Sequence, residues 1–92
     1  MAPQCYYCKT KHRELTRDHK FPLGRGGADT QDNVVLACGR CNRVKADMTE
    51  AEFRRYIELY GFATPAELKR RGMNYSEIKA SLRPLRRHIA GR

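Results

Sequence analysis

A short stretch of the chain gathers side chains that could act on a phosphate ester. Asp18 and His19 are adjacent, Asn33 follows a glycine-rich segment, and Asn42 and Lys45 stand one helical turn apart. An imidazole is well suited to take a proton from water near neutral pH, which makes His19 the candidate general base. The Asp18 carboxylate and the Asn42 carbonyl are hard oxygen ligands of the kind that Mg²⁺ or Mn²⁺ prefers. Together these groups suit phosphodiester hydrolysis, which needs an activated water and a cation on the phosphate.

Each of these residues also has an ordinary explanation when it is taken alone. A histidine in a basic protein is often a surface residue, and an asparagine before a strand is often a turn residue. We expect Asn33 to act indirectly, with its amide bonding to the backbone near His19 and holding the loop that aims the imidazole. Lys45 is a candidate phosphate contact, and a solvated helix residue is the alternative. The ordered combination is what favours a catalytic site.

The cysteines form two knuckles, Cys5-x-x-Cys8 and Cys38-x-x-Cys41. Four thiolates make a closed tetrahedral set for one zinc ion, which would hold the fold together and do no chemistry. Two disulfides or a rubredoxin-like iron site are the alternatives, and a thioredoxin-like redox role is less favoured because neither knuckle has the required strand-helix-strand surroundings. A 92-residue chain buries little apolar surface, so a staple of this kind is expected.

Charge points to a polyanionic partner. The formal net charge is +9, and residues 69–92 carry eight basic side chains against one acidic. The segment before the first knuckle has neither the basic nor the apolar part of a signal peptide, and no apolar run approaches the roughly 20 residues that cross a bilayer. We therefore expect a soluble protein that binds DNA. The predicted DNA contacts surround the Asp-His turn and follow the basic tail: Arg17, Lys20, Arg25, Lys79, Arg83, Arg86 and Arg87.

The first part of the chain is predicted to form strand, loop, strand and helix. Residues 15–21 are a short extended candidate, residues 23–32 are glycine-rich loop, and residues 34–36 are a second strand. A brief helix should follow over residues 40–47. Successive side chains of a strand point to opposite faces, so the first strand must end or bulge at Asp18 and His19 if both serve one phosphate.

The second part of the chain carries helix signals. Thr49 and Glu52 form a capping box for a helix to Tyr60, and Thr64-Pro65 starts another that should close at Gly72. A third helix is predicted from Asn74. Its apolar seam would be Ile78, Leu82, Leu85 and Ile89, with a kink or split at Pro84. Residues 1–48 are thus predicted as a zinc-bound core and residues 49–92 as a helical, basic extension of the same domain.

These motifs resemble the HNH endonuclease family, in the variant that brackets its motif with four zinc-binding cysteines. The resemblance covers roughly residues 5–48. Asp18-His19 matches the first element, Asn33 matches the central asparagine, and Asn42 stands where the last histidine is usual, which makes this an H-N-N variant. The resemblance implies a small α+β, zinc-stabilised domain with a ββα-metal core followed by C-terminal helices. It also implies one catalytic divalent ion held by Asp18 and Asn42.

The sequence therefore predicts a metal-dependent DNA endonuclease whose single site nicks one strand per encounter. We expect one structural Zn²⁺ and one catalytic Mg²⁺ or Mn²⁺, with other divalent transition metals as possible substitutes. We also expect a monomer or weak homodimer in the cytoplasm of a prokaryotic or phage-infected cell. The alternative is a non-catalytic zinc-knuckle module that binds DNA and never cuts it. A redox or zinc-storage protein would leave the basic tail unexplained.

Overall fold

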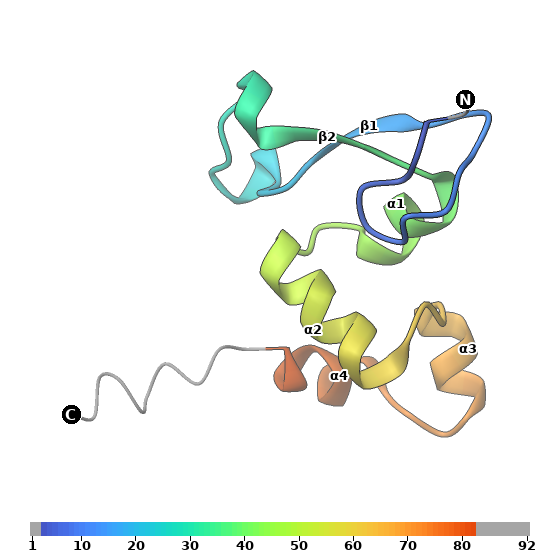
Figure 1. Cartoon of the computed structure of the whole chain (residues 1–92). Coiled ribbons are helices and arrows are strands. Elements are labelled where there is room, and N and C mark those ends of the chain that lie inside the picture. Colours follow the sequence, from blue (N-terminus) through green and yellow to red (C-terminus); the bar gives the residue numbers. More distant parts are fainter. Residues whose placement is uncertain (1–2, 83–92) are drawn as a thin grey trace.

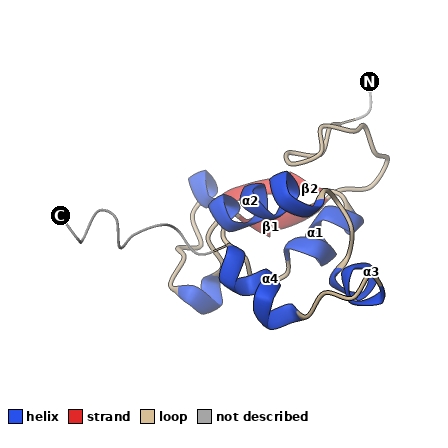
Figure 2. Ribbon diagram, turned by 90° about the horizontal axis from the view of Figure 1, so that it is seen from below, coloured by secondary structure: helices blue, strands red, loops and turns tan. Residues whose placement is uncertain are grey.

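A two-stranded hairpin and a short helix form the first half of the molecule. The computed structural model describes residues 3–82. Strand β1 (Thr16–His19) pairs antiparallel with β2 (Val34–Ala37), in a register that sets Asp18 opposite Val35. Helix α1 (Gly39–Lys45) follows, and all four α-helices lie on one side of the hairpin (Figures 1 and 2). The predicted order of strand, loop, strand and helix is confirmed.

The first strand is shorter than the predicted extended segment 15–21. It ends at His19, because the amide of Phe21 bonds to the side chain of Asn33 and not to a neighbouring strand. Helix α1 also begins and ends earlier than predicted. The Cys38 sulfur accepts a hydrogen bond from the Cys41 amide at its start, and Ala46, with φ of 47°, stops the helix.

The loop between the strands is irregular, as predicted, and contains two short 3₁₀ turns at Leu23–Arg25 and Gln31–Asn33. Gly27 is required where the loop folds back on itself. A Cβ there would lie 1.9 Å from the Phe21 carbonyl oxygen, so no other residue fits without moving the backbone. The loop therefore returns close to the end of β1.

Three helices make up the described part of the extension: α2 (Glu50–Tyr60), α3 (Pro65–Arg70) and α4 (Tyr75–Ser81). The predicted capping box at Thr49 is present, and the predicted helix start at Thr64 also forms a capping box. Helix α3 ends before Gly72, which has a φ of 92°. The predicted seam residues Leu85 and Ile89 and the kink at Pro84 lie outside the described residues. No helix in residues 3–82 is long and apolar enough to cross a membrane.

The core is continuous from the first knuckle to the extension. An aromatic series runs through it, with ring centroids 5.0 Å apart for Tyr7 and Phe53, 6.4 Å for Phe53 and Tyr56, and 5.2 Å for Tyr56 and Tyr60. Offset and edge-to-face pairs of this kind add to the stabilisation from burial. The helices of the extension therefore hold the N-terminal knuckle against the hairpin.

Candidate active site and metal centre

The two cysteine knuckles meet in one cluster. The sulfur atoms of Cys5, Cys8, Cys38 and Cys41 all lie within 4.8 Å of one another. The cysteines are free thiols, so the alternative of two disulfides does not describe this structure. Four sulfurs held at about 2.3 Å around a tetrahedral zinc would stand about 3.8 Å apart. The Sγ atoms of Cys8 and Cys38 are 4.0 Å apart, so the cluster can hold a metal ion of that size.

The thiols differ in how readily they ionise. Burial raises the pKa of Cys5, but backbone hydrogen bonds from Cys38, Cys8 and Tyr7 outweigh burial and lower that pKa to about 6. Burial, followed by hydrogen bonds from Cys38 and Cys5, raises the pKa of Cys41 far above its usual value. Thiolates are the metal ligands, so metal binding must displace protons from this cluster and weaken as the pH falls.

We expect purified protein to contain one zinc per chain and to unfold when a strong chelator removes it. Zinc binding by closed thiolate sites is worth about 10–16 kcal/mol at pH 7. That exceeds the free energy of unfolding of a small domain, which is roughly 5 kcal/mol. Elemental analysis and circular dichroism with and without chelator check this. A metal-free protein that keeps its fold in chelator would contradict it.

Four of the five predicted site residues, all except Asn33, line an open hollow of about 270 Å³ between the end of β1, the loop and α1. Its walls bring together Asp18 and His19 from the strand and Asn42 from the first turn of the helix. Neighbouring side chains within a strand point to opposite faces, but the strand ends at His19. Asp18 and His19 can therefore both line the same hollow. The lining residues are Arg17, Asp18, His19, Pro22, Leu23, Asn42, Lys45 and Ala46.

Asp18 is buried, and its two oxygens differ. Oδ2 accepts a hydrogen bond from the Tyr7 hydroxyl at 2.6 Å and pairs with the Lys45 ammonium at 3.2 Å. Burial raises the pKa of Tyr7 and the bond to Asp18 raises it further, so the phenol stays protonated and donates. Oδ1 has no hydrogen-bond partner among the described residues. Oδ1 is also not fully enclosed, because every fully buried side-chain oxygen or nitrogen of the described residues has a hydrogen-bond partner. Oδ1 is therefore open to the hollow.

Asn42 offers a second oxygen to the same hollow. Its Nδ2 donates to the hydroxyl of Thr16 at 2.8 Å, which fixes the orientation of the amide. Its Oδ1 has no hydrogen-bond partner within residues 3–82. One carboxylate oxygen and one amide oxygen, together with waters, make a donor set that fits Mg²⁺ or Mn²⁺.

Lys45, which was predicted as a phosphate contact, is held by partners within the protein. Its side chain is 1% exposed, and its ammonium donates to the backbone carbonyl of His19 at 2.9 Å as well as pairing with Asp18. Asp18 therefore compensates the charge of Lys45, and the side chain contributes to the wall of the hollow while being almost fully buried. Residue spacing does not reveal that this side chain turns inward.

His19 has a partner that the sequence did not reveal. Its Nε2 lies 2.9 Å from Oδ1 of Asp29, a loop residue. The hydrogen bond to His19 is the main cause that holds the pKa of Asp29 below its usual value, and Arg17 adds to it. An ionised carboxylate only accepts hydrogen bonds, so Nε2 carries the proton and Nδ1 is left as the basic nitrogen. The residue type of Asp29 gave only a loop signal, because the contact depends on how the loop returns.

Asn33 makes the hydrogen bonds that were expected of it. Its Oδ1 accepts from the amide of Phe21, and its Nδ2 donates to the carbonyls of Phe21 and Ala28 at 3.0 and 2.8 Å. The start of the loop at Phe21 and its middle at Ala28 are thereby tied to the residue that precedes β2. Asn33 is absent from the lining of the hollow, so it can influence the site only through the loop.

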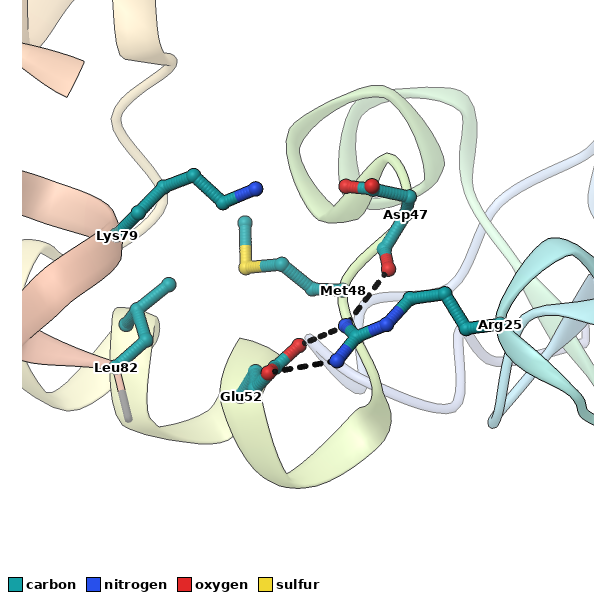
Figure 3. A pocket seen from close by; sticks show the side chains of 6 residues that line it. All are labelled: Arg25, Asp47, Met48, Glu52, Lys79 and Leu82. Atoms are coloured by element: carbon teal, nitrogen blue, oxygen red, sulfur yellow. Dashed lines mark hydrogen bonds and ion pairs between the residues drawn. The ribbon is translucent and has the colours of Figure 1, made fainter. Parts of the chain in front are cut away.

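Arg25, which was predicted as a DNA contact, bonds to other groups of the protein. Its guanidinium bonds to both carboxylate oxygens of Glu52 and to the carbonyl of Asp47, which ties the loop to α2 (Figure 3). Lys79 extends from α4 toward the same pocket. Arg17 is 69% exposed beside the hollow. Lys20, another predicted DNA contact, is half-buried. The remaining predicted contacts, Arg83, Arg86 and Arg87, lie outside the described residues.

Comparison with known proteins gives one match. A family model described as HNH endonuclease matches residues 5–58, which include the cysteine cluster, the hairpin, α1 and most of α2. The match covers more than half of the chain and extends beyond residue 48, where the sequence resemblance ended. No curated protein and no solved structure matches the chain.

Proposed function

The chain belongs to the HNH endonuclease family, and from this we propose that it is a metal-dependent enzyme that hydrolyses phosphodiester bonds in DNA. One observation carries the proposal. Asp18, His19 and Asn42 line a single hollow that is open to solvent, and Oδ1 of Asp18 and Oδ1 of Asn42 have no hydrogen-bond partner within residues 3–82. Such a site has room for a phosphate between a cation and a base.

The roles follow from the donor sets. Oδ1 of Asp18 and Oδ1 of Asn42 would hold one divalent cation, Mg²⁺ or Mn²⁺, which when bound supplies positive charge to the scissile phosphate and the leaving oxygen. Nδ1 of His19 takes a proton from water as the water oxygen forms its bond to phosphorus. The phosphorus bond to the leaving sugar oxygen then breaks. One site of this kind cuts one strand, so nicking is the proposed output.

The cysteine cluster has a separate role in this proposal. With four protein ligands, zinc has no open position, so it stabilises the fold and leaves chemistry to the hollow. In this proposal Arg17, which is exposed beside the hollow, contacts the DNA backbone, and Lys79 on α4 makes a further contact. Each phosphate contact releases counterions, so binding should weaken as salt increases.

Binding and cleavage should be measured on the same duplex, because a non-catalytic DNA-binding module is the rival. We expect a labelled duplex both to shift in a gel with the protein and to be nicked once Mg²⁺ or Mn²⁺ is added. If the protein binds the duplex but does not cut it in Mg²⁺, Mn²⁺, Co²⁺ or Ni²⁺, the result would favour the non-catalytic DNA-binding module.

Replacing Asp29 with alanine should slow nicking about tenfold, in the range seen for residues that orient a catalytic group through a hydrogen bond. The asparagine variant keeps an acceptor for the His19 ring and should recover much of that loss. Asp32→Ala is the matched control, because that carboxylate bonds to Thr30 in the same loop. Single-turnover nicking rates of the three variants check this. Equal rates for Asp29→Ala and the parent would show that the contact with His19 has no part in catalysis.

A further inference from the structure

A tyrosine of the first cysteine knuckle reaches the candidate active site. Tyr7 stands between Cys5 and Cys8 in the sequence and is 4% exposed. Its hydroxyl donates to Oδ2 of Asp18 at 2.6 Å, in a buried contact between residues 11 positions apart in the sequence. One residue therefore belongs to the first knuckle and also contacts Asp18, which lines the hollow.

The Tyr7 ring is held firmly enough to place its hydroxyl. Tyr6 packs edge-on against it at 5.1 Å, Phe53 does the same at 5.0 Å, and the Lys45 ammonium lies 6.0 Å from the ring centroid. Side chains that are locked by packing position their polar groups with little freedom. The packing thus fixes the orientation of the Tyr7 hydroxyl toward Asp18, its hydrogen-bond partner within residues 3–82.

Two donors occupy the same oxygen of Asp18. Oδ2 is held by Tyr7 and by Lys45, whereas Oδ1 has no partner among residues 3–82. A carboxylate held in this way can offer a cation only one oxygen without breaking a buried hydrogen bond. Mg²⁺ and Mn²⁺ accept single-oxygen ligands and keep several waters, whereas Ca²⁺ readily takes both oxygens of a carboxylate.

We infer that Tyr7 is a positioning residue: its hydroxyl fixes Asp18 as a one-oxygen ligand, favours Mg²⁺ or Mn²⁺ over Ca²⁺, and links the cysteine cluster to the catalytic cation site. The inference rests on the proposed function, in which Asp18 binds that cation. According to this inference, the first knuckle positions a ligand of the catalytic cation in addition to binding its own metal.

The test uses the full, zinc-loaded chain and measures binding of Mn²⁺ from the electron paramagnetic resonance signal of the free ion, with Ca²⁺ as competitor. Tyr7→Phe should weaken Mn²⁺ binding about tenfold, as loss of an outer hydrogen bond to a metal ligand commonly does. It should also make Ca²⁺ a better competitor relative to Mn²⁺. Tyr6→Phe is the matched control in the same knuckle, because its hydroxyl bonds to Glu50 and not to Asp18.

Asp18→Ala separates the inference from the proposed function. If this variant binds Mn²⁺ as the parent does, Asp18 is not a ligand and the proposed cation site is wrong. If it loses Mn²⁺ while Tyr7→Phe keeps both the parent affinity and the parent preference over Ca²⁺, the site stands and the inference is overturned. Loss of zinc together with Mn²⁺ in Tyr7→Phe would also overturn it, because Tyr7 would then act through the fold.

Discussion

Replacing His19 with alanine should lower strand cleavage at least about 100-fold, because general-base catalysis contributes roughly 10²–10⁴ to rates. DNA affinity and zinc content should remain close to those of the parent. The imidazole lies at the end of β1, bonds to an exposed loop carboxylate and takes no part in the buried core. Its removal should therefore leave the fold and the cysteine cluster in place. Single-turnover nicking, gel-shift titration and elemental analysis of one preparation check the three parts together.

His12→Ala is the matched control for this variant. Its Nε2 lies 3.9 Å from the sulfur of Cys8, and it does not line the hollow. We expect nicking by zinc-loaded His12→Ala to match the parent. If His19→Ala nicks at the parent rate, another group is the base. If His12→Ala is the inactive variant, the site has been assigned to the wrong part of the molecule.

Asn42→Ala should nearly abolish cleavage in Mg²⁺, because it removes one of only two protein oxygens proposed for the cation. Mg²⁺ gives up its waters reluctantly and should then be held too loosely for turnover. Asn42→His replaces the oxygen with an imidazole nitrogen, which suits Ni²⁺, Co²⁺ and Zn²⁺ better than Mg²⁺. That variant should stay active and shift its optimum toward those metals. Nicking rates across a metal series check both variants.

Thr16→Val distinguishes the oxygen of Asn42 from its amide nitrogen. The Thr16 hydroxyl accepts from Nδ2 of Asn42, so this variant frees the amide but keeps the proposed ligand oxygen. We expect a smaller loss than for Asn42→Ala and no change in the order of metals. If Asn42→Ala cuts like the parent at low Mg²⁺, or if Asn42→His leaves the metal order unchanged, Asn42 is not a ligand.

Local signals in the sequence predicted most of the described elements. The capping boxes at Thr49 and Thr64 depend on residues only three positions apart, and both are present. The two cysteine knuckles are equally local, and a tetrahedral donor set requires them to meet. Asn33 was predicted to bond to the backbone near His19, and its amide makes hydrogen bonds to the backbone of Phe21 and Ala28. Local pattern and tertiary structure agree at these positions.

The contacts that define the site could not be predicted, because they depend on the path of the chain. Asp29 reaches His19 only after the loop has folded back, and nothing in the spacing of the two residues indicates this. Lys45 was predicted as a phosphate contact or a solvated helix residue, yet it is buried, and Asp18 and a backbone carbonyl satisfy its ammonium group there. Arg25 was assigned to DNA from its charge, and the structure pairs it with Glu52.

Supercoiled plasmid incubated with the purified, zinc-loaded protein gives the most direct measurement of the central claim. We predict that Mg²⁺ or Mn²⁺ converts the plasmid to the open-circular form, that excess chelator added just before the plasmid prevents this, and that His19→Ala, purified in the same way, leaves the plasmid supercoiled. Conversion at equal rates by the parent and His19→Ala, or no conversion by the parent in any divalent metal, would contradict the account.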